Sequence, residues 1–311
     1  MYKMKRTLFL IAFNIVCFLG FAQSNIRLNN YWENTNYINP GSIDEKYFIE
    51  LSTAARKQWL NLPGSPATFF ALGTAYIEKM HTQLGLKVTQ DKIGYTAASD
   101  IDLSYAYALK INSEWKLHLG VAACYQMLSY DLSQMNLQNS SDPAASAGLL
   151  KENNFNANIG AELIRDSWKF GVASQNLFSL FSDINKQYTN TNFLYGIYNQ
   201  HTDQLVNLGL GVCGIKYGNL YQMEFNATSY FDITDRRFNR LKESEMFHVG
   251  LFYRTKNEMG VIFGIDMSNL LSLSYSYDFN LSGISRSSIG TNELILSYKM
   301  YKPVKCRNCN Y

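Results

Sequence analysis

From about residue 46 onward, apolar and polar side chains alternate with a period of two in one segment after another. Residues 273–279 show the pattern clearly, because apolar residues stand at every second position and small polar ones between them (Leu-Ser-Tyr-Ser-Tyr-Asp-Phe). The alternation recurs at 101–108, 155–163, 206–213, 221–227 and 294–300. Successive side chains of a β-strand point to opposite faces, so this period predicts an all-β chain.

The length and the faces of these segments favour a membrane barrel. Each segment runs for about 9–11 residues, which suits a tilted membrane-spanning strand and exceeds the usual strand of a soluble protein. One face is apolar and nearly free of charge, while the other carries small, polar and charged residues. Lipid cannot satisfy an open strand edge, so such strands must close into a ring. We therefore predict a transmembrane antiparallel β-barrel; the alternative is a soluble β-sandwich, whose strands also alternate.

We count about fourteen segments, an even number as single-chain outer-membrane barrels prefer. Their expected starts are Tyr47, Ala67, Thr82, Ser99, Trp115, Asn154, Ser167, Thr191, Gln204, Asn219, Met246, Glu258, Leu270 and Thr291. Both chain ends would then be periplasmic, with long outer loops and short inner turns. The alternation of loop lengths fails at 216–218 and 229–245, where either the count slips or an inner loop is enlarged. That charged loop is either a partner contact or simply solvated.

The N-terminus has the form of a signal peptide. Lys3, Lys5 and Arg6 precede an apolar run that ends near small residues, so cleavage is expected after Ala22 and export through the Sec pathway. A membrane-anchoring helix is the alternative, but the run is short for one. We expect a signal peptide at 1–22, a periplasmic lead-in at 23–45, an outer-membrane barrel at 46–301 and a tail at 302–311.

The charge balance argues against a nucleic-acid partner. The signal holds three of the 28 basic residues, which leaves 25 against 25 acidic residues in the mature chain. Charged residues make up 17% of the chain, where about 25% is usual for a soluble domain. A neutral, aromatic-rich and weakly charged exported chain is expected to contact the lipid bilayer, not nucleic acid.

Residues that could carry chemistry are few and scattered. His118 and His248 belong to rows predicted to face inward, and no histidine pair has the spacing of metal ligands. Cys306 and Cys309 form a Cys-x-x-Cys pair beyond the last strand, where free thiols or a local disulfide are the expected states. We expect no catalytic residue, no metal and no cofactor. The glycines within strands are expected to relieve crowding on the lumen side.

Several short strings resemble the PorP/SprF family of the type IX secretion system of Bacteroidetes. In order they are Asn39-Pro40-Gly41, Arg56-Lys57-Gln58-Trp59, Leu62-Pro63-Gly64-Ser65-Pro66, Asp91-Lys92-Ile93-Gly94, Ser104-Tyr105-Ala106-Tyr107, Tyr275-Ser276-Tyr277-Asp278 and Asn292-Glu293. The resemblance runs from about residue 30 to the C-terminus. It implies a non-enzymatic part in exporting or anchoring large surface proteins such as gliding adhesins. The implied partners are a cargo protein with a C-terminal sorting domain and other secretion components.

Two loops that carry these strings are expected on the outer side of the barrel, at 55–66 and 90–98. The candidate residues are Arg56, Gln58, Trp59, Pro63, Gly64, Asp91, Lys92 and Gly94. They form either a surface that contacts a partner protein, with Trp59 as an aromatic anchor, or a brace of the barrel mouth in which Arg56 or Lys57 pairs with Asp91.

The lumen decides between a secretion component and the alternative function, a channel for small solutes or fatty acids. Its rows are rich in Gly, Ala, Ser and Asn, with few charges. A lumen of this kind could be filled by loops or a plug, whereas a diffusion porin should show rings of charge. A barrel of about fourteen strands is too narrow to pass a folded adhesin, so the chain should accompany cargo and not conduct it.

Overall fold

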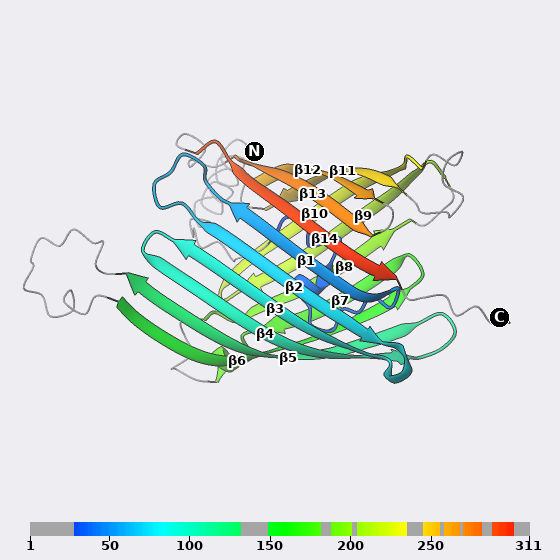
Figure 1. Ribbon diagram of the computed structural model, residues 1–311, viewed down its shortest axis with the longest axis horizontal. Helices are drawn as coiled ribbons and strands as arrows, with labels where there is room; N and C mark the ends of the chain where they lie inside the picture. The colour runs from blue at the N-terminus through cyan, green and yellow to red at the C-terminus, as the bar shows by residue number, and fades with distance from the viewer. Residues whose placement is uncertain are drawn as a thin grey trace, which may run out of the picture.

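The protein is a closed antiparallel barrel in the computed structural model, which describes residues 28–131, 149–181, 188–200, 204–234, 245–255, 258–267, 270–281 and 288–301. Within these ranges fourteen strands pair, each with its neighbours in sequence, and β14 closes the ring against β1 (Figure 1). The predicted fold and strand number are confirmed. The expected signal peptide, Cys306 and Cys309 lie outside the described residues.

The strands are β1 (Tyr47–Lys57), β2 (Ala67–Ile77), β3 (Thr82–Ile93), β4 (Thr96–Lys110), β5 (Lys116–Asp131), β6 (Leu149–Arg165), β7 (Trp168–Gln175), β8 (Thr191–Asn199), β9 (Val206–Tyr217), β10 (Leu220–Asp232), β11 (Met246–Arg254), β12 (Glu258–Met267), β13 (Leu271–Asn280) and β14 (Thr291–Tyr301). Short 3-10 helices are η1 (Thr35–Tyr37), η2 (Glu78–Met80) and η4 (Leu177–Leu180).

The barrel has two rims. We call the end where β1 begins and β14 ends the terminal rim, and the opposite end, where β1 passes into β2, the distal rim. β5 and β6 are among the longest strands and extend beyond their neighbours at the distal rim (Figure 1). The two-residue turn 218–219 joins β9 to β10 at the distal rim, whereas the longer connection 233–245 lies at the terminal rim. The irregular loop lengths therefore reflect an enlarged loop and not an error in the count.

The outer wall is apolar because the outward residue of each alternating pair is apolar. On β9, for example, Leu208, Leu210 and Val212 are 48%, 53% and 40% exposed, and the inward Cys213 is fully buried. Cys124 and Cys213 are both free, buried thiols, as expected of small inward residues. No helix in the described ranges is long and apolar enough to cross a membrane.

The core of the molecule lies inside the ring. It is built around residues 28–46, which we call the plug, drawn in dark blue within the strands (Figure 1). The described part of the expected periplasmic lead-in is therefore not outside the barrel but in its lumen. The physical reason is that its apolar side chains pack there and its many asparagines find hydrogen-bond partners on the inner wall. The main buried cluster joins Leu28, Tyr31 and Trp32 of the plug to inward residues of the strands.

Candidate functional site

The plug is compact although it contains only one short helix. Asn34 caps η1 with its side-chain oxygen, which accepts a hydrogen bond from the Asn36 N–H at 3.0 Å. Asn29 and Asn39 are fully buried at either side of this turn. Buried asparagine side chains need hydrogen-bond donors and acceptors around them. The polar residues of the inward rows supply both to this segment.

Asn29 is the most highly bonded residue of the plug. Its backbone N–H lies 2.8 Å from both carboxylate oxygens of Glu293, and its side-chain amide donates to Asp278. Its side-chain oxygen accepts from two buried arginines, Arg254 at 2.7 Å and Arg56. One small side chain thereby satisfies acids and bases from β1, β11, β13 and β14 at once.

The groups around Asn29 form what we call the charged clamp, made of Arg56, Glu224, Arg254, Asp278 and Glu293. Arg56 lies 3.0 Å from Asp278 and 3.0 Å from Glu293, and all three side chains are at most 4% exposed. Arg254 pairs with Glu224 and lies 3.7 Å from Asp278. Three carboxylates thus face two guanidinium groups. The Asn29 N–H donors offset the remaining negative charge, because buried carboxylates need hydrogen bonds as well as counter-charges.

A second anchor is the Asn39-Pro40-Gly41 string. It lies against Gly120 of β5 and Gly160 of β6, where a Cβ on either glycine would collide with Pro40 or Asn39. A Cβ on Gly41 would lie 2.6 Å from the Gly160 carbonyl oxygen. Only residues without side chains allow the two backbones to approach this closely.

Further contacts tie the plug to other parts of the wall. The Tyr31 hydroxyl donates to Glu224 at 2.6 Å, and the Thr35 hydroxyl donates to Glu162 at 2.9 Å. Trp32 lies on Gly211, where a Cβ would come within 2.6 Å of its ring, as expected of a glycine that relieves crowding. The plug is therefore bonded to walls on all sides of the lumen.

Near the terminal rim, Glu45, the last residue but one of the plug, forms an ion pair with the barrel wall. Lys116 lies 2.7 Å from one Glu45 oxygen and the His118 ring nitrogen 3.2 Å from the other. The hydrogen bond with His118, together with the bond and charge of Lys116, lowers the pKa of Glu45 to about 2, against desolvation that raises it. His118 and His248 both face inward as predicted, and they are 1% and 0% exposed.

On the distal side, the plug forms the floor of a cavity of about 420 Å³. Leu28, Tyr37 and Ile38 line the floor, and acidic residues such as Asp100 and Asp102 line the wall. Lys87 lies 2.8 Å from Asp102 and offsets part of this negative charge. No group of His, Cys, Asp and Glu in the described ranges is arranged to hold a metal ion.

The predicted site residues divide between the lumen and the distal rim. Arg56 and Asp91 are buried and face the lumen, at 6% and 4% exposure. The expected brace of Arg56 or Lys57 with Asp91 takes a different form: Arg56 pairs with Asp278 and Glu293, and Asp91 accepts from Thr68. The register explains this, because Arg56 lies directly opposite Glu293, whereas Thr68 separates it from Asp91.

Lys57 and the loop after β1 lie at the rim. The Lys57 ammonium donates to the Ser65 carbonyl at 2.8 Å, and the Gln58 N–H donates to the Pro66 carbonyl at 2.9 Å. Trp59 is partly exposed and its backbone is left-handed, with φ 46°. Pro63 is exposed at the tip of the loop.

The two motif loops touch one another. The Gly94 N–H donates to the Gly64 carbonyl at 2.9 Å, and both glycines have positive φ, at 57° and 69°. Lys92 is exposed beside them. The same rim loop bonds to the connection before β14, since the Leu60 N–H donates to the Gly290 carbonyl at 2.9 Å. The rim thus brings together Trp59, Pro63, Gly64, Lys92 and Gly94, while Arg56 and Asp91 belong to the lumen.

Sequence reasoning missed the residues that hold the plug. Asn29, Arg254, Gly120 and Gly160 were not singled out as a set, and Glu293 appeared only as part of a family string. A usable signal was present, because a strand predicted to carry charge on its inward row needs a partner inside the ring.

Among solved structures, the chain resembles the outer membrane protein Omp33 of Acinetobacter baumannii, with 9% identity, a TM-score of 0.47 and coverage of 82% of this chain and 99% of that one. It also resembles the CymD monoaromatic hydrocarbon channel, with 10% identity, a TM-score of 0.48 and coverage of 91% and 95%. A Pseudomonas aeruginosa FadL homologue matches with 10% identity, a TM-score of 0.44 and coverage of 85% and 93%. No curated protein matches the chain.

A family model also matches. It is described as "Type IX secretion system membrane protein PorP/SprF", and it matches residues 20–298, nearly the whole chain.

Proposed function

Because the chain belongs to the PorP/SprF family of type IX secretion system membrane proteins, we propose that it is a plugged, non-enzymatic barrel that anchors or helps export large secreted proteins. The family places it in the bacterial outer membrane among other secretion components. Gliding adhesins are the kind of cargo that the resemblance implies, recognised through a C-terminal sorting domain.

The plug is the observation that carries this proposal. It is hydrogen-bonded to β1, β6, β8, β10 and β14 through mostly buried groups. A channel for small solutes or fatty acids, the alternative function, needs a passage that opens without loss of structure. Releasing this plug would remove the hydrogen bonds that Asn29 and Tyr31 donate to the buried carboxylates of the clamp, and each buried group left without its partner costs about 1–3 kcal/mol.

The distal rim is the surface that we assign to the partner. Trp59 and Pro63 expose apolar area there, and the bond between Gly64 and Gly94 holds their loop in one arrangement. An aromatic anchor on a pre-organised loop is typical of a binding hot spot. In this arrangement the distal rim faces the cell exterior and the terminal rim faces the periplasm.

The test is a pull-down from outer membranes with the full-length protein as bait. We expect a large secreted protein with a C-terminal sorting domain to be enriched, and its enrichment to fall at least about tenfold when Trp59 is replaced by Ala, the equivalent of 1.4 kcal/mol. Recovery of equal amounts of cargo with both baits would refute the rim as the contact. Recovery of no secretion component with either bait would refute the proposed function.

A further inference from the structure

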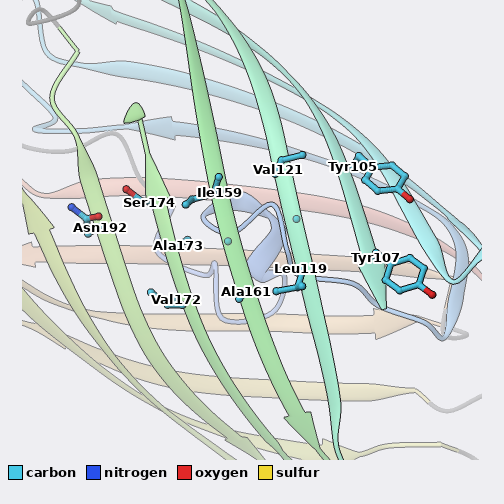
Figure 2. Close-up of a pocket in the computed structure, with 12 residues that line it drawn as sticks. Tyr105, Tyr107, Leu119, Val121, Ile159, Ala161, Val172, Ala173, Ser174 and Asn192 are labelled. Carbon is cyan, nitrogen blue, oxygen red and sulfur yellow. The ribbon is translucent and has the colours of Figure 1, made fainter. Parts of the chain in front are cut away.

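A second site lies on the outside of the barrel, away from the plug and the rim loops. It is a groove of about 600 Å³ that crosses β4, β5, β6, β7 and β8 on the outward face (Figure 2). Two cross-strand rows of side chains form its walls. One row is Tyr107, Leu119, Ala161 and Val172, and the other is Tyr105, Val121, Ile159, Ser174 and Asn192.

The floor of the groove is the backbone of the sheet. Between the two rows runs the inward row Ala106, Gly120, Gly160 and Ala173, in which the two central residues have no side chain. These are the glycines on which the plug's Pro40 and Gly41 lie. The row faces the lumen, where the plug packs on it, so on the outer face only its backbone forms the floor between the two rows.

The lining of the groove is apolar in its middle, and Tyr105 and Tyr107 line the end on β4 (Figure 2). Leu119, Val121 and Ile159 are 47%, 54% and 46% exposed on its walls. Ala161 has the smallest side chain of its row and widens the middle. Ser174 and Asn192 carry polar groups at the end that lies near the distal rim, beside the last residue of β7 and the first of β8.

We propose that this groove holds one acyl chain of an outer-membrane lipid, with the lipid's polar ester region beside Ser174 and Asn192. The groove is continuous with the lipid-facing wall, so hydrocarbon is the medium that meets it. Water is excluded as a filling, because an apolar cavity offers it no hydrogen-bond partners.

The dimensions fit one chain. Five strands about 4.8 Å apart give a groove about 19 Å long, and one leaflet of the hydrocarbon core is about 15 Å thick. Barrel strands tilt by about 35–45°, so a groove that runs across them is inclined to the membrane by a similar angle. A chain entering from the distal leaflet can follow it from Ser174 toward Tyr107.

The experiment measures lipid that remains on the purified full-length protein. Protein in mild detergent is incubated with palmitoyl-oleoyl phosphatidylethanolamine and examined by native mass spectrometry. We expect one tightly held lipid on the wild type. Ala161→Phe fills the groove, so lipid retention should fall at least about tenfold, the equivalent of 1.4 kcal/mol.

Ala227→Phe is the matched control, because Ala227 is an exposed alanine on the outer wall of β10 and lines no part of the groove. This variant should retain lipid as the wild type does. Val121→Trp narrows the groove from the opposite row. It is the variant to test if Ala161→Phe fails to fold. Equal lipid retention in the groove variants and the control would overturn the proposal, as would a co-purifying polypeptide in place of lipid.

Discussion

At the scale of single residues, the stability of the fold depends on small polar side chains that form hydrogen bonds with buried charged residues. Asn29 donates to two acids of the clamp, Asp278 and Glu293, and accepts from both of its arginines. A carboxamide has donors and an acceptor in one planar group, which neither Asp nor Leu offers. The wild-type residue therefore helps three buried carboxylates and two guanidinium groups to share one site.

Replacing Asn29 with Asp removes the amide donors and adds a carboxylate beside Asp278 and Glu293. We expect the folded barrel to lose about 3 kcal/mol, within the range for an uncompensated buried charge. The measurement is the temperature at which the folded band is lost in heat-modifiability gels. Asn61→Asp is the control, since Asn61 is exposed at the distal rim. Equal melting of the two variants would show that Asn29 is not a central contact.

A second residue prediction concerns Gly160. A methyl group there would overlap the Asn39 side chain, so Gly160→Ala should displace the plug from β6. A cysteine placed at Ser42, which is buried in the plug, should then react with a thiol reagent at least about tenfold faster, the equivalent of 1.4 kcal/mol in an opening equilibrium. Gly196→Ala is the control, because its nearest neighbour would lie at an ordinary 3.4 Å. Unchanged labelling in Gly160→Ala would contradict the close contact.

The ion pair of Glu45 gives a prediction about pH. Its pKa is lowered from 4.5 to about 2 in the folded state, so the stability from its ionised form is present above about pH 4.5 and is lost as the pH falls toward 2. The difference in melting temperature between the wild type and Glu45→Gln should therefore shrink over that interval. A difference that stays constant down to pH 2 would show that Glu45 is not held by Lys116 and His118.

At the scale of elements, the distal rim is a small assembly of three loops. The loop after β1 bonds to the turn after β3 through Gly64 and Gly94, and to the connection before β14 through Leu60 and Gly290. Backbone hydrogen bonds therefore hold the loop in place, and this arrangement does not depend on the side chains of Trp59, Pro63 and Lys92. Arg56, in contrast, holds β1 to β13 and β14 from inside the barrel.

This division separates binding from stability. Trp59→Ala should reduce surface display of the cargo while the amount of folded barrel in the outer membrane stays unchanged. Arg56→Ala should reduce the amount of barrel itself, because it leaves Asp278 and Glu293 short of a counter-charge. Immunoblots of outer membranes and surface labelling of cargo distinguish the two. Loss of the barrel in Trp59→Ala would mean that Trp59 braces the rim.

At the scale of the whole molecule, the barrel and the plug form one folded unit. The wall supplies the partners of the plug, and the plug supplies the apolar core that a ring of this size cannot build from its own inward rows. The apolar outer rows meet lipid and hold the ring in the membrane.

Deletion of residues 28–44 should convert the barrel into a leaky pore. In planar bilayers we expect the wild type to show little steady conductance and the deletion variant to show a large, stable one, since the plug is bonded across the lumen. A high steady conductance of the wild type would favour the solute channel. Equal conductance of both proteins would mean that other parts of the chain close the lumen.

The sequence by itself determined the membrane barrel, its fourteen strands and the direction of each row, because a period of two is a local property that the backbone geometry of a strand imposes. It located most strand starts to within a residue or two, with larger errors at Ser99, where β4 begins at Thr96, and at Asn154, where β6 begins at Leu149. The alternation of apolar and polar residues does not mark where these two strands begin.

Only the tertiary structure decided what fills the ring. Asn29 is separated from Asp278 by 249 positions and from Glu293 by 264. Arg56 is separated from the same two acids by 222 and 237 positions. No local pattern encodes such pairs, since they depend on the closure of the barrel and on which segment reaches its interior. The placement of residues 28–46 in the lumen, and the division of the motif residues between lumen and rim, follow from that closure.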